Sequence, residues 1–570
     1  MKNAISILII ILFTQCALAQ NKEVYTLWEE VENLEKKGLT SSALKLVETI
    51  SKQAELDKNA EQQIKTLLYK SKYALILEEN AQLKIINSFK QELSKATFPT
   101  KNILENMLAN LYWQYFKQHR HTFYNRTKTS EKVDETDFRT WDLQTLFSEI
   151  HYHYQNALQN DLMLQLEPLS EYETMVEISE DSKLYMPTLF DFINHNALEF
   201  YQTKETSITQ PAYKFEIDSQ EFLSDAQTFS TINIRSIDSS SLQLHALKIY
   251  QNLILFHLND KDPYALTDVN IKRLQFIGEE ASFNDIDTVL LKTLQTEKNR
   301  LMPHEASGLY DYQIASLLYK KGQTFNPKAN PASQWKTKEA MDICKNITER
   351  FPNSKAEELC TILKKQIEEE TIQIITENYI PVQQESRILI QYKNIEELYF
   401  KVYELSSNEL QKLNEIFRKE EQLKFINKLK VAKKWTSVLK NEFDFQSHST
   451  EIIIPKLNNG SYIIFASPQA KTENTFAFST IQVTNLALVE SEDEQYKRFQ
   501  LIDRNNGQPI DSSEITLRYN QNYKNKIQSK TFVTDNHGIV KIDKDNDRYR
   551  NLTVSVKHGI DYATFGTYFS

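Results

Sequence analysis

The side chains with the greatest capacity for chemistry in this chain are aromatic residues and carboxylates between positions 112 and 149. They are Tyr112, Trp113, Trp141, Asp142 and Glu149. Enzymes that cleave glycosidic bonds use paired carboxyl groups beside aromatic side chains, so this set could belong to a helical sugar-cleaving barrel. Large aromatic side chains in helical arrays also fill the gaps between helices. We favour this second interpretation and expect the chain not to be an enzyme.

Histidine pairs offer metal binding as a second possible chemistry. His119 and His121 are two positions apart, and so are His151 and His153. On a helix this spacing directs the two side chains to different faces, so neither pair can easily share a metal ion. The sequence has no H-E-x-x-H, C-x-x-C, calcium-loop, phosphate-loop or G-x-S-x-G pattern. We therefore expect no metal, no cofactor and no catalytic residue.

Cys344 and Cys360 are the candidate residues for a disulfide. They fall on what the sequence predicts to be two neighbouring antiparallel helices, separated by residues 350–354. In an oxidising compartment they could pair. A buried pair of thiols is the alternative, and the sequence leaves both interpretations open.

Paired α-helices are predicted over residues 21–370, and they would position these side chains. Leu27, Val31 and Leu34 lie on one face of a first helix, which ends at Gly38. Similar apolar spacing recurs in residues 43–50, 64–77, 83–89, 103–116, 143–158, 242–256, 289–301, 312–322 and 340–352. Each hairpin would bury its apolar face on its neighbours, which predicts an α-solenoid. The last two of these segments resemble a tetratricopeptide-type unit.

Short strands are predicted from residue 371 onward. Between residues 371 and 490 they cover 372–375, 386–392, 398–403, 450–454 and 461–465, with a helical insert over Asn408 to Leu439. In residues 491–570, apolar and polar positions alternate over 515–519 and 552–556. This period of two is typical of half-buried antiparallel strands. Asn505–Gly507 and Asp535–Gly538 supply turns, so the pattern predicts two β-sandwiches.

The turn residues carry a family resemblance. Asp503-Arg504-x-x-Gly507-x-Pro509, followed by Thr534-Asp535-x-x-Gly538, resembles the second macroglobulin-like domain of the α2-macroglobulin superfamily. Tyr392-Lys-Asn394 and Ile454-Pro-x-Leu-x-x-Gly460-x-Tyr462 resemble the first such domain. Three upstream segments resemble the N-terminal region of large exported macroglobulin-family proteins of Bacteroidota. These segments are Phe123-Tyr-Asn-Arg-Thr, Arg139-Thr-Trp-Asp-Leu and Pro187-Thr-Leu-Phe-Asp-Phe.

The resemblance implies an α+β multidomain chain with an N-terminal α-helical solenoid and two macroglobulin-like β-sandwiches, the last of them incomplete. The expected bounds are 21–370, 371–490 and 491–570, and we expect the chain to be a fragment of a longer protein. The family implies an endopeptidase inhibitor that traps proteases. Some members carry a thioester between a Cys and a Gln three positions later. Here Ile347 follows Cys344 and Leu363 follows Cys360 at that spacing, so we expect no thioester.

Residues 1–20 are predicted to be a secretory signal peptide. Lys2 supplies the positive start, Ile5 to Phe13 the apolar core, and Ala17 to Ala19 a small-x-small cleavage site. Cys16 suggests a lipoprotein instead, but Gln15 stands where a small residue is expected. We therefore expect export to the periplasm or outer cell envelope, with no membrane-spanning segment in the mature chain.

Charge limits the classes of partner. The chain carries 67 Lys and Arg against 77 Asp and Glu, a formal net charge of -10, which argues against nucleic acid. Proteins are the expected partners. Two functions remain open: a protease trap, or a cell-envelope scaffold or receptor-associated module that binds proteins through helical repeats and uses the sandwiches as spacers.

Overall fold

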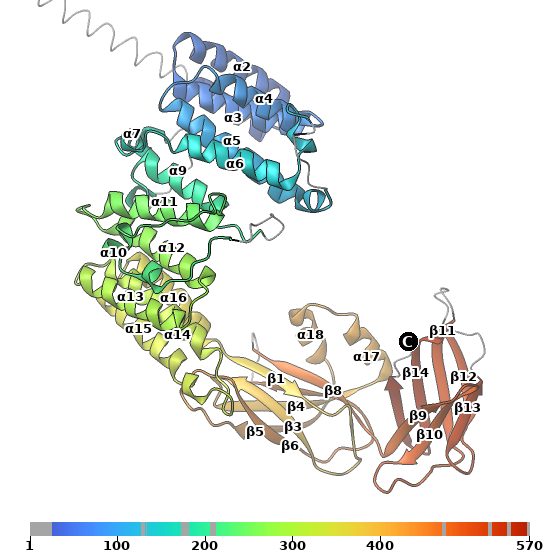
Figure 1. Ribbon diagram of the computed structural model, residues 1–570. Helices are drawn as coiled ribbons and strands as arrows, with labels where there is room; N and C mark the ends of the chain where they lie inside the picture. Colours follow the sequence, from blue (N-terminus) through green and yellow to red (C-terminus); the bar gives the residue numbers. More distant parts are fainter. Residues whose placement is uncertain are drawn as a thin grey trace, which may run out of the picture. The chain divides into compact units, whose positions relative to one another are not determined.

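The computed structural model describes residues 25–126, 132, 134–172, 182–205, 213–469, 475–521, 527–543 and 549–566. The predicted signal peptide and Cys16 lie outside the described residues. The chain divides into two compact units, Met1–Ile314 and Ala315–Ser570, and each is described by itself. The fold is α+β, with helices first and β-sheets after them (Figure 1).

The first unit consists of helices that pack mostly against their neighbours in sequence, as the α2–α3, α5–α6 and α11–α12 pairs do. After a helix over residues 25–36, the α-helices are α2 (Thr40–Leu56), α3 (Ala60–Leu77), α4 (Ala81–Leu93), α5 (Thr100–Tyr124), α6 (Leu143–Ala157), α7 (Asp161–Leu164), α8 (Ser182–Tyr185), α9 (Leu189–Tyr201), α10 (Ala226–Ser230), α11 (Leu242–His257), α12 (Tyr264–Glu280) and α13 (Ile286–Leu301). Short 3-10 helices cover Phe138–Thr140, Leu169–Tyr172 and Gln220–Leu223. The apolar faces predicted from the sequence are buried: Ala43, Val47 and Ile50 of α2 are at most 1% exposed.

Helix α12 was not among the predicted elements, because almost every side of it is buried and it has no polar face to give a period. Its centre holds Arg273, which is completely buried. The Arg273 guanidinium donates to the carbonyl oxygens of Phe222 at 2.6 Å and Ser224 at 2.7 Å, and to the Asn270 side chain. Burial lowers the pKa of Arg273 to about 10. This arginine therefore holds the segment between α9 and α11 in place.

The second unit opens with helices that are tied to the first sandwich. The division falls within α14 (Ser307–Gly322), and α15 (Lys336–Arg350) and α16 (Lys355–Glu368) follow a short 3-10 turn, Pro331–Ser333. A Cβ atom on Gly322 would lie 2.1 Å from Thr337 Oγ1, so α14 and α15 touch closely there. The Gln446 side chain, between two strands of the sandwich, donates to Thr337 Oγ1 at 2.9 Å.

The first sandwich packs a three-stranded sheet against a five-stranded sheet. The strand orders are β1-β3-β6 and β2-β8-β7-β4-β5. The strands are β1 (Thr371–Ile375), β2 (Tyr379–Ile380), β3 (Ser386–Lys393), β4 (Glu397–Leu405), β5 (Val431–Val438), β6 (His448–Ile454), β7 (Gly460–Ser467) and β8 (Ala477–Val483). Their shared core includes Ile390, Leu398, Phe400, Ile454 and Ile464.

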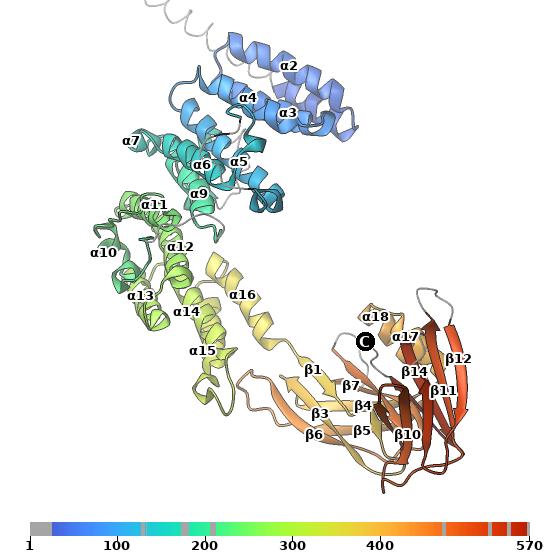
Figure 2. The ribbon, with the colours of Figure 1, turned by 45° about the vertical axis from the view of Figure 1, so that its right-hand side comes forward.

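The predicted helical insert, Asn408 to Leu439, extends too far. Only α17 (Ser407–Asn414) and α18 (Lys419–Ile426) are helical, and they cover one side of the five-stranded sheet (Figures 1 and 2). The remainder forms strand β5. Its lysines resemble a solvated helix face in the sequence, but Trp435 stacks on Phe400 of β4 with ring centroids 4.8 Å apart. That stacking and the pairing with β4 stabilise residues 431–438 as a strand.

The second sandwich packs sheet β13-β10-β9 against sheet β12-β11-β14-β15 (Figure 2). Its strands are β9 (Leu486–Glu492), β10 (Tyr496–Asp503), β11 (Glu514–Gln521), β12 (Ile527–Val533), β13 (Ile539–Asp543), β14 (Tyr549–His558) and β15 (Asp561–Gly566). The alternation predicted for residues 515–519 is confirmed, since Ile515, Leu517 and Tyr519 are buried. The predicted domain bounds at residues 370 and 490, and continuation past Ser570, stay predictions.

Candidate functional site

The aromatic and acidic residues singled out in the sequence lie in the core of the first unit. Tyr112, Trp113 and Trp141 are at most 5% exposed, and Tyr112 stacks on Trp141 with ring centroids 6.0 Å apart. Asp142 caps α6 by accepting from the Thr145 amide at 2.7 Å. Glu149 pairs with Lys132 at 2.9 Å and with Lys90 at 3.3 Å. The aromatic groups fill space between helices, and each carboxylate has partners of its own.

The two histidines of α6 have different partners, as their spacing predicts. His153 bonds Glu105 at 2.5 Å and lies 3.6 Å from Glu149. Burial disfavours its charged form, but the two carboxylates outweigh burial and raise the pKa of His153. His151 bonds the Tyr201 hydroxyl at 2.8 Å, and burial beside His245 lowers the pKa of His151 to about 4. Both imidazoles connect helices of the first unit.

A third buried imidazole ties α11 to α9. His257 Nε2 lies 2.7 Å from Asp191 Oδ1, and its Nδ1 lies 2.6 Å from Asp260 Oδ2. Burial alone would lower the pKa of His257, yet the hydrogen bonds to Asp191 and Asp260 raise it. Asp191 also completes a capping box with Thr188 at the start of α9. His257 therefore links the start of one helix to a helix–helix contact.

The cysteines of the predicted disulfide are fully buried on two helices that pack together. Cys344 lies on α15 and Cys360 on α16, and residues 351–354 join the two helices. A disulfide between them stays a prediction. Alkylating the unfolded protein before and after reduction would distinguish it from a pair of thiols.

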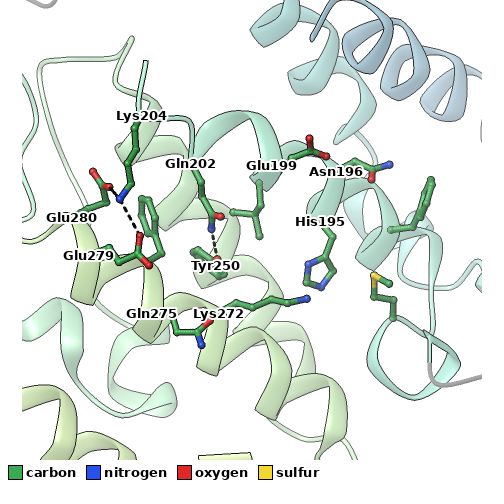
Figure 3. A pocket seen from close by; sticks show the side chains of 14 residues that line it. His195, Asn196, Glu199, Gln202, Lys204, Tyr250, Lys272, Gln275, Glu279 and Glu280 are labelled. Carbon is green, nitrogen blue, oxygen red and sulfur yellow. Dashed lines mark hydrogen bonds and ion pairs between the residues drawn. The ribbon is translucent and has the colours of Figure 1, made fainter. Parts of the chain in front are cut away.

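A pocket of about 550 Å³ opens between α9, α11 and α12 in the first unit (Figure 3). Polar side chains dominate its lining: His195, Asn196, Glu199, Gln202, Lys204, Tyr250, Lys272, Gln275, Glu279 and Glu280. Met186, Phe192, Leu198 and Phe276 add apolar surface. This pocket could not be predicted from the sequence, because its residues come from three helices and from the segments on either side of α9.

His195 of α9 is one of the residues that line this pocket. Burial, with help from the nearby Lys272 ammonium, lowers the pKa of His195 to about 4, so the imidazole is neutral at pH 7. Figure 3 shows Lys272 extending toward His195. The Nε2 atom of His195 is buried and has no hydrogen-bond partner among the described residues. A buried polar atom without a hydrogen-bond partner costs stability.

The charged groups of the pocket are already compensated. Lys204 pairs with Glu279 at 2.9 Å and Glu280 at 3.2 Å, and Glu199 pairs with Lys117 at 2.6 Å. Amide, hydroxyl and imidazole groups therefore provide most of the free hydrogen-bonding capacity. The lining residues include neither a serine nor a cysteine, and their amide groups suit polar recognition.

The turn motif of the second sandwich closes two neighbouring turns. Asp503 accepts from the Asn505 amide at 2.8 Å, and the Gly507 amide returns to the Asp503 carbonyl at 2.8 Å. Gly538 has φ +71°, and a Cβ there would lie 2.4 Å from the Leu501 carbonyl oxygen. Only glycine fits that position, so the motif glycine is required by backbone contact.

Arg504 of the same motif reaches into the first sandwich. Its Nη1 donates to the Tyr379 carbonyl at 2.7 Å, and its amide donates to the Asn485 carbonyl at 2.7 Å. Asn485 lies in the linker between β8 and β9, and its side-chain oxygen accepts from the Val382 amide at 3.0 Å. The motif therefore fixes the connection between the sandwiches as well as a turn.

Asp561, at the start of β15, holds the linker from the other side. It accepts from the Thr484 hydroxyl at 2.6 Å, from the Asn485 amide at 2.8 Å, and from the Asn459 side chain. Nearby, the side-chain amide of Gln482 donates to the Thr564 carbonyl and accepts from the Thr564 backbone amide, both at 2.6 Å, as a neighbouring strand would. We call Arg504, Asn485 and Asp561 with these partners the sandwich junction.

Within the described ranges, no group of three or more His, Cys, Asp or Glu side chains is arranged to hold a metal ion. No helix in that part of the chain is long and apolar enough to cross a bilayer.

Comparison with known proteins gives remote matches. No family model matches the chain, and no curated protein matches it. Among solved structures, it is similar to native alpha-2-macroglobulin from Escherichia coli. For a fragment spanning domains MG0-NIE-MG1 the TM-score is 0.27 and the identity 10%, over 35% of this chain and 64% of that chain. For a fragment spanning NIE-MG1 the TM-score is 0.26 and the identity 10%, over 35% of this chain and 97% of that chain.

A CARDB domain from Pyrococcus furiosus matches with a TM-score of 0.13 and 14% identity, over 20% of this chain and 92% of that chain. The chain thus spans less than two thirds of the first alpha-2-macroglobulin fragment. TM-scores of this size do not establish a shared fold. The assignment of two β-sandwiches therefore rests on the strands, their pairing and their cores.

Proposed function

We propose that this chain is the N-terminal part of an exported, macroglobulin-family endopeptidase inhibitor that traps proteases. The observation that carries the proposal is the position of the D-R-x-x-G-x-P and T-D-x-x-G motifs. Their glycines close turns of the second of two tandem sandwiches, and Arg504 joins that sandwich to the first. The family resemblance of these residues supplies the function, and the tandem sandwiches are consistent with it.

Trapping needs no catalytic group, because it depends on domains that rearrange after a bound protease cuts the inhibitor. The helical unit would then act as a docking platform. The protein would act in the periplasm or outer cell envelope, to which the proposed signal peptide would direct it.

The test mixes the protein made from the complete reading frame with several unrelated endopeptidases. We expect cleavage to change its migration on a native gel and to lower protease activity on large substrates more than on small ones. A protein inactivated by prior cleavage is the control. If size and protease activity remain unchanged with every protease, the proposal is wrong.

The pocket between α9, α11 and α12 favours the second function, a cell-envelope module that binds proteins. Its uncompensated polar groups suit a polypeptide segment better than a charged metabolite. A photo-crosslinking residue at Asn196, which lines the pocket, tests this in cells. We expect a crosslink to one protein. This crosslink should disappear in the Gln275→Arg variant, whose larger side chain fills the pocket. Crosslinks that are absent, or that survive Gln275→Arg, contradict this function.

A further inference from the structure

One stretch of this acidic chain is strongly basic. Residues 424–440 contain six lysines and no aspartate or glutamate, while the whole chain has a formal net charge of -10. The six lysines are all exposed: Lys424, Lys428, Lys430, Lys433, Lys434 and Lys440. Two have acidic partners, since Lys430 pairs with Glu404 and Lys440 with Glu442. For the other four, no ion pair is found in the described part of the chain.

These lysines follow an open strand edge. They run from α18 through β5, which is the outermost strand of the sheet β2-β8-β7-β4-β5 and pairs only with β4. The Leu439 amide donates to the Glu396 carbonyl at 2.7 Å, toward β4. Successive amides of a strand point in opposite directions, so the amides of Lys434, Thr436 and Val438 point away from β4. Val438 is 84% exposed, in agreement with an uncovered edge.

The edge contains a like-charge pair. Lys434 of β5 lies directly opposite Lys401 of β4. By the alternation above, this is a non-hydrogen-bonded pair, in which facing side chains come closest. Like charges in such a position destabilise a sheet. A carboxylate from a third strand beside β5 would relieve the repulsion.

We propose that the free edge of β5 binds an acidic polypeptide segment in an extended conformation. The segment would add a strand to the sheet, with main-chain hydrogen bonds at Lys434, Thr436 and Val438. Its carboxylates would lie on the face of the sheet that Lys434 shares with Lys401. Edge lysines commonly prevent unwanted strand pairing. Here the edge lysines disfavour pairing with neutral and basic strands. Pairing with a second copy of β5 is also disfavoured, because it would bring Lys433 and Lys434 of both copies together. The same charges favour an acidic strand.

The test measures fluorescence anisotropy of a labelled acetylated peptide in which glutamate alternates with valine, titrated with the full chain. Lys433→Gln/Lys434→Gln removes two charges from the edge. Lys364→Gln/Lys365→Gln removes two adjacent charges from α16 and is the matched control. Thr436→Pro removes an outward amide without altering the charge or the pairing with β4. A peptide with lysine in place of glutamate and a double-stranded DNA oligonucleotide are the alternative probes.

We expect the glutamate peptide to bind. The edge double variant and Thr436→Pro should each weaken binding at least tenfold, and the α16 double variant should leave it unchanged. Circular dichroism of each variant shows that it is folded. Binding that Thr436→Pro leaves intact would identify a general anionic surface and overturn strand addition. Equal binding of DNA, or no binding of the glutamate peptide at millimolar concentration, would also overturn the proposal. The outcome is independent of whether the protein traps proteases.

Discussion

Replacing Asp561 by Asn should loosen the sandwich junction. Asp561 accepts three hydrogen bonds, from Thr484, Asn485 and Asn459. An asparagine keeps one oxygen acceptor and turns an NH₂ group toward the remaining donor. If the oxygen stays with Thr484 and Asn459, the NH₂ group faces the Asn485 amide, and that bond is lost.

The expected cost follows from the bonds involved. A hydrogen bond to a charged group contributes about 1.5–3 kcal/mol, and loss of the charge also weakens the two bonds that remain. We therefore expect the junction to lose about 2–4 kcal/mol of stability. Since 1.4 kcal/mol is a factor of ten in an equilibrium constant, local opening should become roughly 30- to 700-fold more frequent.

Hydrogen exchange measured by mass spectrometry or NMR reports this opening directly. The Asn485 amide donates to Asp561, and the Arg504 amide donates to the Asn485 carbonyl. Both amides should exchange faster in Asp561→Asn, while core amides such as that of Leu517 keep their rates. Asp511→Asn makes the same charge change at an exposed position of the same sandwich and is the control. Unchanged exchange at Asn485 and Arg504 would refute the assignment of Asp561 as the residue that holds the linker.

Three further predictions concern packing and charge. Gly322→Ala places a Cβ 2.1 Å from Thr337 Oγ1, so we expect a loss of about 1–3 kcal/mol, measured by urea unfolding. Because the pKa of His257 is raised from its ordinary 6.5, His257→Gln should cost most below pH 6.5, and the cost should shrink as pH rises through the folded-state pKa. A cost that is constant between about pH 5.5 and 8.5 contradicts that assignment. Arg273→Met leaves two buried carbonyl groups without a donor and should destabilise the first unit by about 3–5 kcal/mol in thermal unfolding, whereas Arg235→Met, at an exposed site, should have little effect.

The helices and strands with one polar face could be read from the sequence. The apolar spacing of α2 and the alternation of β11 each identify an element whose exposed side is solvated. Elements that lack this contrast could not be predicted. Helix α12 is buried on nearly every side and includes Arg273, so it shows no clear period. Strand β5 has the opposite problem, because Lys433 and Lys434 conceal the contact of Trp435 with Phe400.

The candidate sites were predictable only in part, for a geometric reason. The turn residues Gly507 and Gly538 could be identified from the local sequence, since a positive φ or a close backbone contact requires glycine. Arg504 donates to the Tyr379 carbonyl, and Asp561 accepts from Thr484, Asn485 and Asn459. All these partners are distant in sequence, so residue type alone does not reveal the contacts. The pocket beside His195 likewise depends on the packing of three helices.

The sandwich junction limits how a conformational mechanism could operate. Asn485 uses its amide, its carbonyl and its side chain at once, with Asp561, Arg504 and Val382 as the partners. Moving one sandwich against the other would break several of these bonds together, while the linker offers no uncommitted segment to absorb the change. A cleavage-driven rearrangement would therefore move the two sandwiches as one body. In a trap, the bending would have to occur elsewhere in the protein. Faster hydrogen exchange of the Asn485 amide after protease treatment would therefore argue against movement of the two sandwiches as one body.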